Sequence, residues 1–315
     1  MKKPNLFIVG APKCGTTSLH EYLSQHPEIF MCPVKEPHYL CSDLHEQADR
    51  FHGKKDSFKG IPNDREYLQL FKDAGDRKII GESTPVYLYS SAAPRLIKKM
   101  SPDAKIIIML REPAEMLYSW HAQLLASGEE DVKSFEKALA LEDARKKDER
   151  LVPATAWNPF RVQYSEHVRF SKYIRNYLRA FRRENILILF LEDMKKDMPR
   201  VYRTVLKFLG VRDTNFVADF SVRNPRTVPK SVFFAKHLKN PPVPVRKLIR
   251  ALAPLPVRRK LSLFLTSILQ KRDFSRINTE KKKRLQKKFL PEVRELDELL
   301  HSEGFLPKEK SVIKL

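Results

Sequence analysis

Short runs of apolar residues, each ending in polar residues and followed by a helix-like pattern, organise the first two thirds of the chain. They span 6–10, 77–83, 104–113 and 185–193 and are rich in β-branched residues. Strands that are buried on both faces of a parallel sheet have continuous apolar runs, whereas half-exposed strands alternate apolar with polar residues. The pattern therefore predicts a doubly wound α/β fold, with a parallel sheet flanked by helices.

Helical periodicity predicts two further elements. A helix over about 165–183 would bury a stripe made by Val168, Tyr173, Tyr177, Leu178 and Phe181. A closing amphipathic helix is indicated by the spacing of Leu285, Phe289, Val293, Leu296 and Leu300. Between them, 220–272 holds thirteen Lys or Arg residues, several prolines and no acidic residue. We expect one domain made of 1–219 with 273–315, and a helical basic extension over 220–272.

The charge of the chain points to anionic partners. Sixty Lys and Arg residues against 38 Asp and Glu residues leave a formal net charge of +22, which favours nucleotides, nucleic acid, acidic glycans or anionic lipid surfaces. Cys14, Cys32 and Cys41 have neither disulfide-framework nor zinc-ligand spacing, which suggests a reducing compartment. The first apolar run is too short for a signal peptide, and no stretch approaches the roughly 18 apolar residues of a membrane span. These observations predict a cytoplasmic protein.

A candidate phosphate loop, "GAPKCGTT", lies at 10–17 between the first predicted strand and a helix. Backbone N–H groups and the helix dipole bind phosphate at such a junction. The predicted ligands are Pro12, Lys13, Cys14, Gly15, Thr16, Thr17 and Ser18. The ATPase fingerprint requires Lys and then Ser or Thr after its second glycine, a place that two threonines take here. The alternative is a simple glycine turn with a solvated lysine.

The motif "PKCGTTSL" resembles the 5'-phosphosulfate loop of sulfotransferases that use PAPS, 3'-phosphoadenosine 5'-phosphosulfate. A second segment, "IIIMLREPAEMLYSW" (106–120), is similar to the family's 3'-phosphate segment. The resemblance covers about 5–210, loosely includes 279–301, and is nearest to bacterial and carbohydrate (heparan-sulfate-type) O-sulfotransferases. It implies a P-loop-like α/β fold, with Arg111 and Ser119 on the 3'-phosphate. Taken alone, Arg111 could simply pair with Glu112 or Glu115.

The segment "KEPHYL" (35–40) is the candidate acid–base centre. Transfer to an alcohol needs a base that takes the hydroxyl proton, and a carboxylate or imidazole can do this. By the resemblance Glu36 is the base and His38 a supporting or alternative base. Lys13 would stabilise charge on the bridging oxygen as the bond to sulfur breaks. No metal is required by this scheme, and a plain ion pair of Glu36 with Lys35 is the alternative.

The resemblance also implies an acceptor cleft and a donor-covering loop. "GESTPVYLYS" (81–90) is similar to an acceptor-lining segment. Candidate acceptor ligands are Lys35, Glu82, Ser83 and Tyr87. Tyr87 fits a core aromatic equally well, and Arg226 and Lys230 occupy the place of a basic loop over the donor. The implied reaction moves a sulfuryl group from PAPS to a glycan, glycolipid or glycosylated metabolite and releases PAP, adenosine 3',5'-bisphosphate.

Other functions compete with this interpretation. A nucleotide kinase or NTPase would need the Walker lysine, and a basic nucleic-acid-binding protein would be expected to show a zinc-finger or RRM signature that is absent from the sequence. Within 220–272, an apolar stripe with cations beside it predicts a peripheral contact with the inner membrane face. Packing of this segment on the catalytic domain is the alternative.

Overall fold

The computed structural model describes residues 2–55, 57, 61, 63–221, 227–229, 270–272 and 277–307. They fall into two compact units. The first comprises Met1–Met116, His167–Asn224 and Thr279–Leu315, and the second comprises Leu117–Glu166 and Pro225–Asn278. Most of the predicted basic segment lies outside the described residues, so this domain division stays a prediction.

The first unit is built around a five-stranded parallel sheet with the order β2-β3-β1-β4-β5. Its strands are β1 (Leu6–Gly10), β2 (Ile29–Met31), β3 (Ile79–Ser83), β4 (Lys105–Leu110) and β5 (Ile186–Phe190). β1 and all but the first residue of β4 are buried, as continuous apolar runs predict. The predicted parallel α/β fold is confirmed, although β2 was not predicted because three residues carry too short a pattern.

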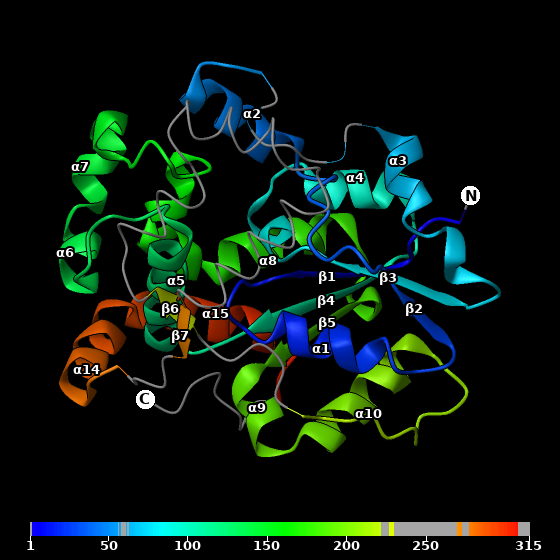
Figure 1. Cartoon of the computed structure of the whole chain (residues 1–315). Helices are drawn as coiled ribbons and strands as arrows, with labels where there is room; N and C mark the ends of the chain where they lie inside the picture. Colours follow the sequence, from blue (N-terminus) through cyan, green and yellow to red (C-terminus); the bar gives the residue numbers. More distant parts are fainter. Residues whose placement is uncertain are drawn as a thin grey trace. The chain divides into compact units, whose positions relative to one another are not determined.

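Helices cover both faces of this sheet (Figure 1). One face carries α1 (Thr16–Leu23), α9 (Leu191–Lys196) and α10 (Met198–Leu209), and the other carries α4 (Ala93–Met100) and α8 (Phe170–Ala180). Right-handed crossovers explain this, because the chain moves in one direction from β1 to β2 and in the other from β3 to β4. The Tyr202 hydroxyl of α10 donates to the Tyr22 carbonyl of α1 at 3.1 Å and ties one layer together.

The remaining helices and strands belong partly to the first unit and partly to the second. In the first unit they include α2 (Ser42–His52), α3 (Asp64–Gln69) and the 3-10 helix η2 (Pro85–Tyr89). The second unit contains most of α5 (Pro113–Ser127), with α6 (Phe135–Ala140), α7 (Glu142–Lys147) and an antiparallel pair, β6 (Thr227–Pro229) and β7 (Gln270–Arg272). Arg145 binds both oxygens of Glu130 at 2.7 and 2.8 Å in its interior. This pair is satisfied further by the Tyr164 hydroxyl, which donates to Glu130 at 2.8 Å.

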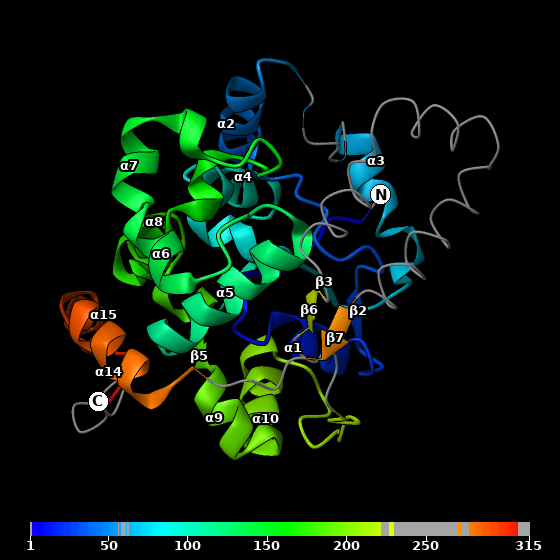
Figure 2. The same ribbon diagram turned by 60° about the vertical axis from the view of Figure 1, so that its left-hand side comes forward.

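Two helix predictions differ from the structure. The predicted helix over 165–183 is a 3-10 turn, Tyr164–Val168, followed by the shorter α8, which ends where Phe181 turns extended. The predicted closing helix is two helices, α14 (Thr279–Lys288) and α15 (Leu290–Ser302). The break falls where Pro291 enters the first turn of α15, because proline lacks an N–H for a continuous helix. α15 packs against α8 (Figure 2).

Within the described part of the chain, no helix has the length and apolar character that a membrane span requires.

Candidate functional site

The candidate residues of the first unit follow the carboxyl ends of parallel strands. Lys13 follows β1, Glu36 follows β2, and Arg111 comes directly after β4. The backbone N–H of Glu36 donates to the Ser83 carbonyl at the end of β3 at 3.0 Å. Ligands of open α/β sheets bind at this edge, because the loops and helix N-termini meet there.

The phosphate loop wraps tightly between β1 and α1. Lys13 and Gly15 both have left-handed backbone conformations, with φ of 65° and 89°. The φ of 89° favours glycine at position 15, where an added Cβ would also lie 2.8 Å from Leu191 Cδ1. No side chain caps α1, so its first N–H groups are available to an anion at the loop. The geometry of Pro12 through Ser18 is therefore compatible with the predicted role of this loop as an anion cradle.

Cys14 in this loop is fully buried. Burial raises the pKa of its thiol well above the usual range, against smaller opposing contributions from Arg111 and Lys13. A thiol held neutral in this way is not a nucleophile, so a loop-fitting role is the one that the structure supports.

Arg111 links the two predicted phosphate sites. Its Nη1 donates to the Lys13 carbonyl at 3.3 Å, and its Nη2 binds Glu115 Oε2 at 2.8 Å. The Nε is buried and has no hydrogen-bond acceptor among the described residues. The pairing of Arg111 with Glu115 that the sequence left open is thus present. The Arg111 Nε–H is an unused donor that could form a hydrogen bond to a phosphate oxygen.

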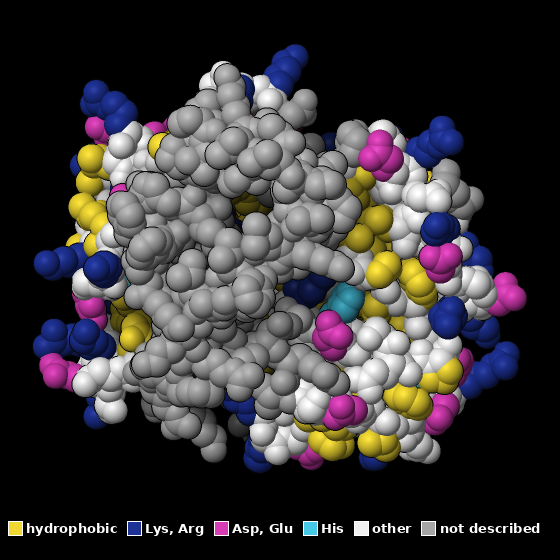
Figure 3. All heavy atoms as spheres, viewed as in Figure 1, with side chains coloured by type: hydrophobic (Ala, Val, Ile, Leu, Met, Phe, Trp, Pro, Cys, Tyr) yellow, Lys and Arg dark blue, Asp and Glu magenta, His cyan; other side chains and the backbone are white. Residues whose placement is uncertain are grey.

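The segment after β2 holds the acid–base candidates in contact. Glu36 Oε1 accepts from Lys35 Nζ at 2.8 Å, and Glu36 Oε2 lies 3.6 Å from His38 Nε2. Glu36 and His38 both have positive φ, 58° and 55°, and strained backbone of this kind is concentrated at functional sites. Figure 3 shows a histidine next to an acidic side chain, with basic atoms nearby.

The charge state of Glu36 follows from its neighbours. Burial of the carboxyl raises its pKa, but hydrogen bonding from His38 and the Lys35 charge outweigh this and lower the pKa to about 2. The side chain is 41% exposed, so an entering hydroxyl can reach it. The carboxylate is ionised at neutral pH, as a proton acceptor must be.

The acceptor-side candidates Glu82, Ser83 and Tyr87 are fully buried. Glu82 accepts from the Tyr67 hydroxyl at 2.6 Å and from Thr84 Oγ1 at 3.0 Å. Burial raises the pKa of Glu82 to about 7, although these hydrogen bonds oppose the shift. The Tyr87 hydroxyl accepts from the Leu40 N–H at 3.0 Å, as a core aromatic would. Their role toward an acceptor stays a prediction.

The remaining predicted donor ligands lie in the second unit or outside the described residues. Ser119 is buried on α5, in the second unit. Arg226 and Lys230 lie outside the described residues, as does most of the predicted membrane-binding segment. Among the described residues, no cluster of three or more His, Cys, Asp and Glu side chains could hold a metal ion.

Sequence reasoning missed His20 and Lys282, which lie near these candidates. His20 lies on the buried face of α1, where burial, aided by the Lys35 charge, lowers its pKa to about 4 and keeps it neutral. Its four-residue spacing from Thr16, on the same helix face, could have found it. Glu115 and Lys282 contact each other across 167 residues, and no local pattern signals such a contact.

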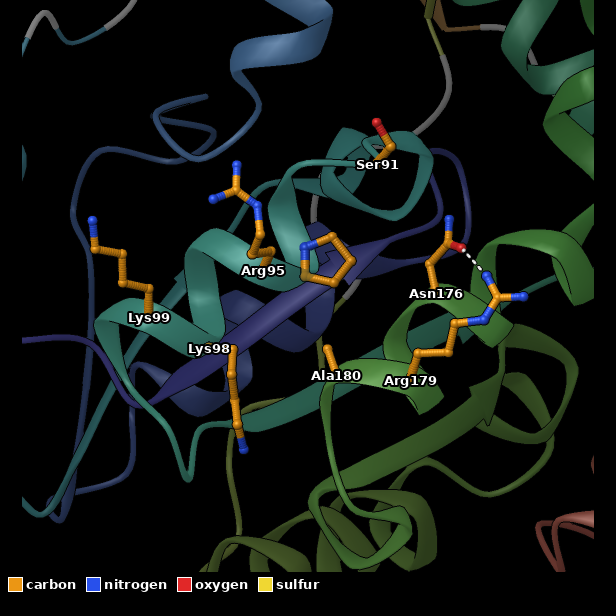
Figure 4. A pocket seen from close by; sticks show the side chains of 8 residues that line it. Ser91, Arg95, Lys98, Lys99, Asn176, Arg179 and Ala180 are labelled. Carbon is orange, nitrogen blue, oxygen red and sulfur yellow. Dashed lines mark hydrogen bonds between the residues drawn. The ribbon is translucent and has the colours of Figure 1, made fainter.

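A basic groove lies between α4 and α8 (Figure 4). It encloses about 630 Å³ and is lined by Ser91, Pro94, Arg95, Lys98, Lys99, Asn176, Arg179 and Ala180. Four of these residues are cationic and none is acidic. Within the described chain, no ion pair joins these four cations to an acidic side chain. The groove contains none of the candidate phosphate or acid–base residues.

Comparison with known proteins identifies the family. The profile described as "Sulfotransferase domain" matches residues 3–240. Carbohydrate sulfotransferase 15 of Rattus norvegicus is 28% identical over 252 residues, which cover 66% of this chain and 44% of that protein. Heparan sulfate glucosamine 3-O-sulfotransferase 6 of Mus musculus is 31% identical over 211 residues, covering 66% and 53% of the two chains. The chain thus spans about half the length of these curated relatives.

A solved structure agrees with the sequence match. The sulfotransferase from Alicyclobacillus acidocaldarius superposes with a TM-score of 0.65 at 26% identity, and the match covers 96% of this chain and 97% of that chain. The resemblance based on two phosphate motifs is confirmed, and the kinase and nucleic-acid-binding interpretations are set aside. The chain belongs to the sulfotransferase family.

Proposed function

We propose that this chain transfers a sulfuryl group from PAPS to a hydroxyl group of a carbohydrate-containing acceptor and releases PAP. One observation carries the proposal: Arg111, at the end of β4, binds the main chain of Lys13 in the phosphate loop at 3.3 Å. A cradle for a 5'-phosphate and a second cation for another phosphate are thereby held together. ATP has no 3'-phosphate to use the second cation.

The residues of the site divide the work of transfer. PAPS supplies an activated sulfuryl group, whose acceptor is a hydroxyl oxygen. Glu36 is placed to take the proton of that hydroxyl as the new S–O bond forms. Lys13 stabilises the negative charge on the phosphate oxygen that the sulfuryl group leaves. Since the Glu36 carboxylate is bound by Lys35, this contact must loosen before Glu36 gains the basicity that the step needs.

The class of acceptor is inferred from the relatives. Their names specify carbohydrate and heparan sulfate glucosamine as the groups that they sulfate. We therefore propose a glycan, a glycolipid or a glycosylated metabolite as acceptor. Lys35, Glu82, Ser83 and Tyr87 are its candidate ligands.

Donor binding gives the first test. PAP at 100 times its dissociation constant should stabilise the native state by about 2.7 kcal/mol. It should therefore raise the melting temperature more than ATP does at the same concentration. Equal shifts from both nucleotides would contradict the donor assignment. Transfer of label from PAPS to a panel of glycans, glycolipids and glycosides then tests the reaction and names the acceptor.

A cytoplasmic location is also part of the proposal. Its support is that Cys14, Cys32 and Cys41 are all free thiols in the structure, which suits a reducing compartment. For 220–272 we propose contact with an anionic membrane surface. Co-sedimentation with anionic but not neutral vesicles, weakened by charge reversal at Arg258, Arg259 and Lys260, would support the contact, and no binding to either would exclude it.

A further inference from the structure

Lys282, on α14, reaches the predicted 3'-phosphate site. Its Nζ lies 3.1 Å from Glu115 Oε1 and 3.9 Å from Glu112 Oε2. The other oxygen of Glu115 binds Arg111 at 2.8 Å. One carboxylate is therefore shared between the guanidinium assigned to the 3'-phosphate and an ammonium group far along the chain.

The three groups are only partly hydrated. The exposed side-chain fractions are 15% for Arg111, 27% for Glu115 and 32% for Lys282. Burial raises the pKa of Glu115, but Lys282 and Arg111 outweigh it and hold the pKa below its usual value, so the carboxylate is ionised. Charges in such an environment interact more strongly than on the open surface.

Glu112 is not equivalent to Glu115. Its carboxylate accepts the N–H groups of Ala114 and Glu115 at 3.1 and 2.9 Å and so caps the first turn of α5. Its oxygens are thus already used by the backbone. Glu115 is the acidic side chain of the pair that can change partner.

A phosphate that binds Arg111 adds negative charge beside Glu115. The two anions would repel each other unless a second cation compensates the carboxylate. Lys282 already contacts Glu115 through the oxygen that Arg111 does not bind. It can keep Glu115 paired when the guanidinium turns to the phosphate.

We propose that Glu115 occupies the Arg111 guanidinium in the absence of donor, and that Lys282 retains Glu115 when a 3'-phosphate takes its place. Lys282 is then a positioning residue that sets the affinity for nucleotides with a 3'-phosphate. It also couples donor binding to the position of α14. The inference rests on the proposed donor, because it requires that Arg111 receives the 3'-phosphate.

The experiment compares PAP with adenosine 5'-monophosphate, which lacks the 3'-phosphate, by calorimetric titration of the full chain. Lys282→Ala should weaken PAP binding about tenfold, equal to about 1.4 kcal/mol, and leave binding of the monophosphate within about twofold. Lys283→Ala is the matched control, since it removes the same charge from an exposed position of α14. It should change neither affinity.

A double-mutant cycle isolates the pair. In a Glu115→Gln background there is no carboxylate to retain, so Lys282→Ala should cost less than about threefold in PAP affinity. Equal PAP affinities for Lys282→Ala and Lys283→Ala would overturn the inference, as would a full tenfold loss in the Glu115→Gln background. Wild-type protein that binds both nucleotides equally would instead refute the donor assignment itself.

Discussion

At the scale of single residues, the proposed base Glu36 is held in an ion pair with Lys35 that must break before the carboxylate can accept a proton. Lys35 and His38 stabilise its charge and lower its pKa to about 2. A general base works best with a pKa near the operating pH. An entering acceptor hydroxyl that displaces Lys35 would raise the pKa of Glu36 and so activate it only when an acceptor is bound.

Glu36→Gln should therefore abolish transfer and spare donor binding. We expect the turnover number to fall by about 10²–10⁴, while the PAP dissociation constant stays within about twofold. Initial-rate measurements with labelled PAPS and a PAP titration check the two parts. Glu46→Gln, an exposed glutamate on α2, is the control. Near-normal turnover would make His38 the base.

Lys13→Ala, by contrast, should weaken both donor binding and transfer, because this residue lies in the phosphate loop. The same two measurements distinguish it from Glu36→Gln. A variant that loses only transfer, with full PAP affinity, would place Lys13 outside the ground-state donor contacts.

The raised pKa of Glu82 predicts that the stability of the protein depends on pH. Its pKa rises from 4.5 toward about 7 on folding, so the native state binds the proton more tightly and stability falls as pH rises between these values. The loss is on the order of 3 kcal/mol. Glu82→Gln mimics the protonated form, so the unfolding free energy of the variant relative to wild type should increase over this pH range and level off above it.

Urea unfolding at a series of pH values measures that difference. Tyr67→Phe is an informative companion, because it removes a hydrogen bond that favours the charged carboxylate. In the Tyr67→Phe variant, the loss of stability caused by ionisation of Glu82 should therefore occur at higher pH. Parallel stability curves for wild type and Glu82→Gln would show that this carboxylate does not titrate there.

At the scale of elements, the junction of β1 and α1 depends on glycine. Gly15→Ala should lower stability by about 1–3 kcal/mol through backbone strain at a φ of 89°, and it should weaken PAP binding because the strained loop backbone shifts. Gly53→Ala is the control: φ is 63° there, but nothing lies within 4 Å of the added carbon. Thermal melts with and without PAP separate strain from damage to the loop, and unchanged PAP affinity in Gly15→Ala would contradict the predicted cradle.

The sequence predicted these elements where their signal is local. Four strands have continuous apolar runs, and the phosphate loop has its glycines between a strand and a helix. The short β2 was not predicted, because its pairing with β3 rather than its own sequence pattern defines it. The division of the closing helix at Pro291 was visible in the sequence, but the spacing of apolar residues continues across it. Lys282 could not be assigned to the site, since only the tertiary fold brings it to Glu115.

At the scale of the whole molecule, the basic residues behind the net charge of +22 are unevenly distributed. Neither α4 nor α8 contains an acidic residue, and the three cations of α4 line one groove with Arg179 of α8. Cations in the last turn of a helix also complement its dipole, which accounts for part of this distribution. An acidic polysaccharide would nevertheless meet four cationic side chains there, with no acidic side chain among the lining residues.

We expect heparin, as a probe, to bind this protein with an affinity that falls steeply with salt, because exposed charges are screened. Charge reversal of Arg95, Lys99 and Arg179 to Glu should lower the salt concentration that elutes the protein from a heparin column. The same change at three exposed lysines elsewhere, Lys72, Lys137 and Lys147, is the control with equal net charge. Identical elution of both triple variants would assign the affinity to net charge alone.

The burial of Cys14, Cys32 and Cys41 has a practical consequence. These are the only cysteines of the chain, and burial raises the pKa of each thiol. The folded protein should hence react slowly with a maleimide dye, while the denatured protein takes up three. A cysteine introduced at Lys283 would then be the fast-reacting position, and a fluorophore there would report, in real time, how α14 responds when nucleotide binds.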